Sequence, residues 1–138
     1  GIPISFLGAL GTMYLAGMDH RIKASMAAGV ITTSRDFMMN RSHMSTWMLY
    51  PPLLPRYFDF CEIYALRVPL PTMVMSCNAD PLYTLAEMKN ADRILSEVFE
   101  KAGALDNYQC NFYPCDHQFH LGMQADCFAW LDSHLKPD

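Results

Sequence analysis

The sequence has no apolar run of the roughly 18 residues that a membrane-spanning helix needs. Internal repeats, low-complexity tracts and linkers are also absent from its 138 residues, so we expect a single domain over residues 1–138. Basic residues are few: 10 Lys and Arg against 14 Asp and Glu give a net charge of −4. That balance argues against nucleic acid or an anionic membrane surface as a partner.

Metal-binding and redox cysteine motifs are absent as well. The five cysteines, an odd number, are Cys61, Cys77, Cys110, Cys115 and Cys127. Most lie in apolar runs, which favours buried, reduced thiols and therefore a cytoplasmic location. Cys110, Cys115, His117 and His120 could be considered as zinc ligands, but their spacing matches no standard finger. We expect no metal and no cofactor.

Short apolar runs alternate with helix-period segments along the chain. The runs at 22–28, 73–79 and 108–113 are typical of buried strands. Helical patterns occupy residues 8–17, 34–39, 60–67, the segment from Thr84 to Gly103, and 123–135. Strands that alternate with helices predict an α/β fold with a parallel sheet and right-handed crossovers. Residues 40–58, rich in proline, lack periodicity and form an irregular excursion.

Two of the predicted helices carry capping signals. Thr84 and Glu87 have the spacing of a capping box, in which the hydroxyl and the carboxylate each bind a free backbone N–H group. Asp59 is the expected cap of the helix that follows it. Gly17 is expected to end the first helix.

Two acid–base residues follow neighbouring strands of the predicted sheet. Asp80 ends the second apolar run, and His117 follows the third. Ligands bind at the carboxyl ends of the strands in such a sheet, and a carboxylate there can orient an imidazole as a general base. We therefore expect an Asp80 carboxylate oxygen within hydrogen-bond reach of His117 Nδ1. Alternatively, Asp80 could be an ordinary Asp-Pro turn residue, and His117 an ordinary loop histidine. His120 could line the site or be solvated. We interpret Asp116 as a surface carboxylate.

Several stretches resemble one family. They are residues 15–24, 46–50, 56–59, 78–82, 112–119 and 128–132. Together they are similar to the C-terminal half of α/β-hydrolases, closest to the dienelactone hydrolase and acetyl xylan esterase-like group. The resemblance implies a carboxylic ester hydrolase with a Ser/Asp/His triad, in the chain order nucleophile, acid, histidine. It assigns Asp80 as the acid and His117 as the base, with a small-molecule ester as substrate.

The nucleophile is the weakest part of the match. The family motif is G-x-S-x-G, with the serine on a sharp strand-to-helix turn. Here Ser5 has Pro3 and Leu7 where the glycines belong, and counting back from Gly8 places Phe6 in the serine column. Either a local shift brings Ser5 to the turn, which would make it the catalytic nucleophile, or the site lacks a nucleophile.

The excursion supplies candidate substrate-binding residues. His43, Trp47 and Tyr50 follow the carboxyl end of the first strand and could line a pocket, or they could simply pack the excursion down. In the family, the first strands and one part of the oxyanion hole precede the nucleophile, whereas this sequence begins at the segment that corresponds to the nucleophile turn. We therefore expect the sheet to be completed by a missing N-terminal half or by a second copy of the chain. The rival interpretations are a non-catalytic hydrolase-like binding module and a fragment without independent function.

Overall fold

The computed structural model describes residues 8–44 and 51–136. Their framework is a three-stranded parallel sheet in the order β1-β2-β3. Its strands are β1 (Ser25–Ala28), β2 (Thr72–Cys77) and β3 (Tyr108–Tyr113). Every residue of the central strand β2 is buried, as a parallel strand covered on both faces requires. The predicted fold class, an α/β structure with a parallel sheet and flanking helices, is confirmed.

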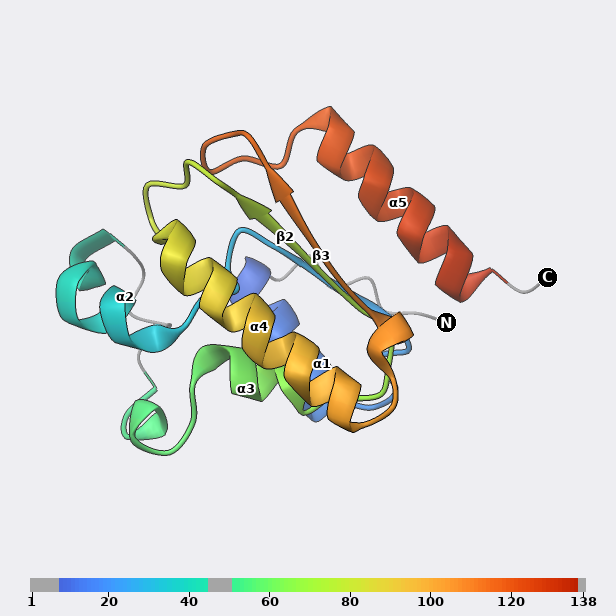
Figure 1. Cartoon of the computed structure of the whole chain (residues 1–138), viewed down its shortest axis with the longest axis horizontal. Coiled ribbons are helices and arrows are strands. Elements are labelled where there is room, and N and C mark those ends of the chain that lie inside the picture. The colour runs from blue at the N-terminus through green and yellow to red at the C-terminus, as the bar shows by residue number, and fades with distance from the viewer. Residues whose placement is uncertain (1–7, 45–50, 137–138) are drawn as a thin grey trace.

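Helices cover both faces of this sheet (Figure 1). On one face lie α1 (Gly8–Met18), α3 (Phe60–Ala65) and α4 (Leu85–Lys101), and the short α2 (Ser34–Asn40) lies beyond them toward one end of the sheet. On the opposite face lies α5 (Leu121–Leu135). The alternating side chains of β2 serve both sides: Val74 joins the core under α1, α3 and α4, while Met73, Met75 and Cys77 pack with Met123 and Cys127 of α5.

The first strand is shorter than the sequence predicts. It begins at Ser25 instead of residue 22, because the parallel register starts with Ser25 opposite Thr72 and Met26 opposite Met73. The third strand has the predicted bounds, but the prediction that it is buried is wrong: its residues are half-buried or exposed, because in the described sheet β3 is paired on one side only.

Gly17 lies within α1 and does not end it, contrary to the sequence prediction. A Cβ atom at this position would lie only 2.2 Å from the carbonyl oxygen of Ile63 in α3. Glycine is therefore required here by the close approach of two helices, since any side chain would collide with backbone.

The capping box is found at a different helix. Thr84 is the N-cap residue of α4, as the sequence predicts, but its side chain makes no cap hydrogen bond, so the predicted capping box is absent. Glu87 instead accepts a hydrogen bond from the Thr33 hydroxyl, which lies 54 positions away in the chain. Asp59 caps α3 as predicted, and Glu62 completes a capping box there by accepting from the Asp59 backbone N–H at 2.7 Å.

The described parts of the excursion contain only short 3₁₀ turns, at Ser42–Met44 and Leu54–Arg56. In the described ranges, no helix is long and apolar enough to cross a membrane.

Candidate active site

Each strand delivers one residue to the same end of the sheet. Gly29 directly follows β1, Asp80 lies three residues past β2, and His117 lies four residues past β3. Because the strands are parallel and adjacent, their carboxyl ends lie together at one end of the sheet, where ligands bind in open α/β sheets. The sequence predicts the meeting of Asp80 and His117 from this placement alone.

Asp80 and His117 are joined by a hydrogen bond. Nδ1 of His117 lies 2.8 Å from Oδ2 of Asp80, within the reach that the sequence predicts. The Asp80 side chain is 0% exposed and that of His117 is 44% exposed. A sealed carboxylate therefore engages one ring nitrogen of an imidazole that solvent can reach. Since Nδ1 is engaged, Nε2 is the nitrogen left for proton transfer, as in an acid–base dyad.

Asp80 also builds its own turn. Its second carboxylate oxygen, Oδ1, accepts a hydrogen bond from the backbone N–H of Leu82 at 2.8 Å. This is the side-chain-to-backbone contact two residues on that defines an Asx turn. The alternatives that the sequence left open are thus compatible, because one oxygen forms the turn and the other orients the imidazole.

Backbone hydrogen bonds tie the turn of Asp80 to the loop of His117. Asn78 N–H donates to the Tyr113 carbonyl at 2.8 Å, and Ala79 N–H donates to the Cys115 carbonyl at 3.0 Å. These bonds continue the β2–β3 ladder past the end of both strands. They hold acid and base in register through the backbone, so the side-chain contact does not depend on two free loops meeting.

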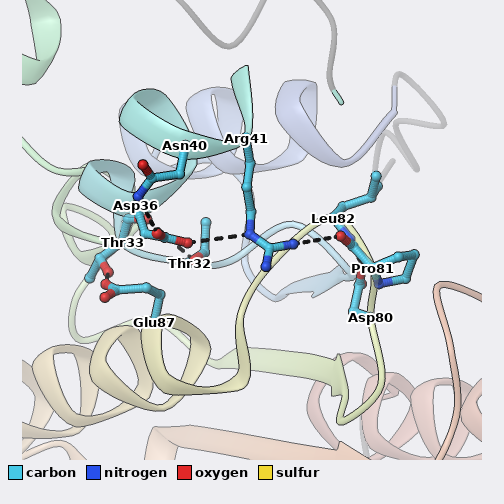
Figure 2. Close-up of polar contacts among 9 residues, drawn as sticks. All are labelled: Thr32, Thr33, Asp36, Asn40, Arg41, Asp80, Pro81, Leu82 and Glu87. Atoms are coloured by element: carbon cyan, nitrogen blue, oxygen red, sulfur yellow. Dashed lines mark hydrogen bonds and ion pairs between the residues drawn. The ribbon is translucent and has the colours of Figure 1, made fainter. Parts of the chain in front are cut away.

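A third segment is fastened to the acid turn by Arg41, which sequence reasoning missed. Figure 2 shows its guanidinium between α2 and the Asp80–Leu82 turn. Nη1 donates to the Pro81 carbonyl at 2.8 Å, and Nε lies 3.4 Å from an Asp36 carboxylate oxygen. The start of the excursion is therefore anchored next to Asp80. Because Arg41 and Pro81 are 40 positions apart, no local sequence signal indicates this contact.

Comparison with solved structures agrees with the parallel α/β fold. A carbohydrate esterase family 15 glucuronoyl esterase from Caldicellulosiruptor kristjansonii aligns with a TM-score of 0.70 at 14% identity, over 92% of this chain and 40% of that one. The glucuronoyl esterase catalytic domain from Hypocrea jecorina gives 0.66 at 14%, over 92% and 41%. A methylesterase, BT1017, gives 0.67 at 18%, over 91% and 27%. The chain has the fold of the C-terminal half of an α/β-hydrolase.

The chain spans less than half the length of each of these three proteins: 40% of the first, 41% of the second and 27% of the third. At this level of identity the likeness concerns the fold alone. No protein-family model and no curated protein sequence matches the chain.

Of the other four predicted site residues, the structure describes only His43. Ser5, Trp47 and Tyr50 lie outside the described residues. His43 is exposed on the 3₁₀ turn that follows Arg41. The structure therefore brings Asp80 and His117 together and leaves the roles of the other four as predictions.

A pair of thiols lies beside the dyad. The Cys115 thiol donates to the Cys77 sulfur at 2.8 Å, and Cys77 in turn contacts the Gln118 carbonyl at 3.6 Å. Both cysteines are free. Burial, followed by the hydrogen bond to Cys77, raises the pKa of Cys115 to about 11. At neutral pH Cys115 is therefore a neutral thiol, which is a poor nucleophile compared with a thiolate.

His120 caps the last helix of the fold. Its Nδ1 accepts hydrogen bonds from the backbone N–H groups of Gly122 at 3.1 Å and Met123 at 3.3 Å. The sequence prediction that it is a solvated or site-lining histidine misses this structural role. In the part of the chain that the structure describes, no group of three His, Cys, Asp or Glu residues is arranged to hold a metal ion.

Proposed function

We propose that the chain carries the acid and the base of a carboxylic ester hydrolase, with Ser5 as its nucleophile. The observation that supports this most is the 2.8 Å contact between His117 Nδ1 and a buried Asp80 carboxylate at the ligand-binding edge of the sheet. Two of the structurally similar proteins are a glucuronoyl esterase and a methylesterase, which supports the same chemistry, as does the resemblance to the dienelactone hydrolase and acetyl xylan esterase-like group. The free cysteines support a cytoplasmic, reducing location.

In the proposed reaction His117 Nε2 takes the proton of the Ser5 hydroxyl, and the oxygen attacks the ester carbonyl carbon. Asp80 stabilises the imidazolium that forms and keeps Nδ1 protonated. The protonated Nε2 then gives its proton to the departing alcohol, which leaves an acyl-serine. Water, deprotonated by the same nitrogen, hydrolyses that acyl group and regenerates the free serine.

The test is an ester-hydrolysis assay on the whole chain with p-nitrophenyl acetate and the methyl ester of glucuronic acid. We expect Ser5→Ala and His117→Ala each to lower kcat by about 10³-fold or more, because either change removes the nucleophile–base pair. His20→Ala, which alters a histidine outside the site, serves as the control and should retain full activity.

Two outcomes contradict the proposal in different ways. Full activity in Ser5→Ala with loss in His117→Ala assigns another nucleophile. An unmutated chain that hydrolyses neither ester favours a non-catalytic binding module, and binding of the esters to that chain by calorimetry would then support it.

We also propose that another polypeptide covers the open edge of the sheet, either the rest of a longer hydrolase or a second copy of this chain. Among the described residues β1 pairs only with β2. In addition, α5 exposes two large apolar side chains, Leu121 and Phe128, which a partner could cover. Unpaired strand edges recruit partners, so light scattering on the isolated chain should report oligomers or aggregates. A monodisperse 15.7 kDa monomer with a cooperative thermal transition would contradict the proposal.

A further inference from the structure

Gly29 forms the surface against which the His117 ring packs. A Cβ atom on Gly29 would lie 3.1 Å from Cε1, 3.4 Å from Nδ1 and 3.9 Å from Nε2 of His117. The three atoms are consecutive in the ring, so the glycine lies against the side of the imidazole that carries Cε1 and both nitrogens. The first is closer than most side-chain carbons approach their neighbours, so an added Cβ would require the ring to shift by a few tenths of an ångström.

The backbone of Gly29 cannot easily move away. Its N–H donates to the Met75 carbonyl at 2.9 Å, which extends the β1–β2 ladder by one residue. Its φ of +64° lies in the left-handed region that disfavours L side chains. The position is therefore fixed by the sheet, and an added methyl group would have to displace the ring.

We propose that Gly29 is a positioning residue for His117. Asp80 fixes the ring through Nδ1, Gly29 fixes how deeply the ring sits, and the two contacts together set the direction of Nε2. Each of the three strands thus supplies one part of the base: β3 the imidazole, β2 the carboxylate and β1 the surface beneath it. The consequence for catalysis rests on the proposed esterase function, whereas the packing contact does not.

The test compares Gly29→Ala with Gly103→Ala. Gly103 has nearly the same φ, +66°, but nothing lies within 4 Å of the position of its Cβ. Both variants therefore carry the backbone strain, and only Gly29→Ala carries the contact with His117. We expect Gly29→Ala to lower kcat by about 10-fold to 100-fold with little change in KM, since small misplacements of a reacting group have effects of this size. Gly103→Ala should keep the kcat of the unmutated chain.

Imidazole NMR separates this inference from the proposed function. In the unmutated chain we expect a nuclear Overhauser effect between Gly29 Hα and His117 Hε1, with the His117 signal assigned by its loss in His117→Gln. In Gly29→Ala the His117 ring signals should shift, and in Gly103→Ala they should not. The Overhauser effect requires neither esterase activity nor the Gly29→Ala variant. The shift is read only if the backbone amide spectrum of Gly29→Ala is that of a folded chain.

Three results would overturn the inference: absence of the Overhauser effect, identical His117 ring signals in Gly29→Ala and the unmutated chain, or equal loss of kcat in the two alanine variants. A chain that hydrolyses no ester but shows the effect and the shift would refute the proposed function while leaving the positioning role of Gly29 in place.

Discussion

Replacing Asp80 by asparagine is expected to lower kcat for ester hydrolysis by about 10⁴-fold, the size of effect known when the acid of such a triad becomes an amide. The asparagine side chain is neutral, so it no longer stabilises the imidazolium of His117. It can also donate to Nδ1, which selects the tautomer whose Nε2 carries the proton and cannot act as a base. KM should change little, because Asp80 is sealed behind the ring, with its side chain 0% exposed.

The fold should survive this substitution. Oδ1 of Asp80 accepts from the Leu82 N–H at 2.8 Å, and asparagine forms the same turn equally well. A loss of activity in Asp80→Asn therefore reports on the dyad and not on unfolding. Circular dichroism of the variant checks that its secondary structure is retained.

Asp116→Asn is the matched control for Asp80→Asn. Asp116 is an exposed carboxylate next to His117 in the sequence, so this variant removes one negative charge from the same loop without touching the Nδ1 contact. We expect it to keep kcat within about twofold, because exposed charges are screened by water and salt. Equal losses in the two variants, or a loss below tenfold in Asp80→Asn, would contradict the role assigned to Asp80.

The parts of the fold that follow from the sequence are those set by local pattern. The run at 108–113 is bounded by Asn107 and Pro114, and the strand Tyr108–Tyr113 has the predicted bounds although none of its residues is buried. The meeting of Asp80 with His117 follows from their places after neighbouring strands, since parallel topology fixes which ends lie together.

The features that the sequence does not show depend on contacts far apart in the chain. Glu87 has the right spacing to Thr84 for a capping box, but it binds Thr33 instead. Gly29 reads as a simple strand boundary, and only the structure shows the His117 ring against it. In both cases the contact is made by residues far apart in the sequence, so the local pattern does not indicate it.

Arg67 is the clearest example of this limit. Arginine is almost never fully buried unless it is paired, and no local pattern in the sequence marks Arg67 as an exception. In the structure Arg67 is 0% exposed. Its guanidinium donates to Thr72 Oγ1 at 2.7 Å, the Pro71 carbonyl at 2.8 Å and the Ala16 carbonyl at 3.2 Å. Burial lowers the pKa of Arg67 from its usual value.

These three bonds join the end of α1, the segment after α3 and the start of β2. Removing the side chain takes one donor from each of three oxygens. The Pro71 carbonyl keeps the Ser25 N–H at 3.1 Å, and Thr72 Oγ1 still donates to the Leu70 carbonyl at 2.8 Å. The cost of about 1–3 kcal/mol for an unsatisfied buried group therefore applies mainly to the Ala16 carbonyl. We therefore expect Arg67→Ala to lower the free energy of unfolding by about 2–4 kcal/mol, from the lost hydrogen bonds and the cavity that the side chain leaves, which is a large fraction of the stability of a typical domain. Urea unfolding followed by circular dichroism measures this directly.

Two further variants determine whether the effect comes from this network. Arg67→Lys keeps the positive charge but replaces a planar fork by a single ammonium group, which cannot reach three separate acceptors in the same geometry. It should therefore fall between the unmutated chain and Arg67→Ala. Arg93→Ala removes an exposed arginine paired with Glu97 one helical turn away, and such pairs contribute less than about 1 kcal/mol. If Arg67→Ala unfolded at the same urea concentration as Arg93→Ala, the three buried hydrogen bonds would not hold α1, α3 and the sheet together, and apolar packing alone would have to account for their arrangement.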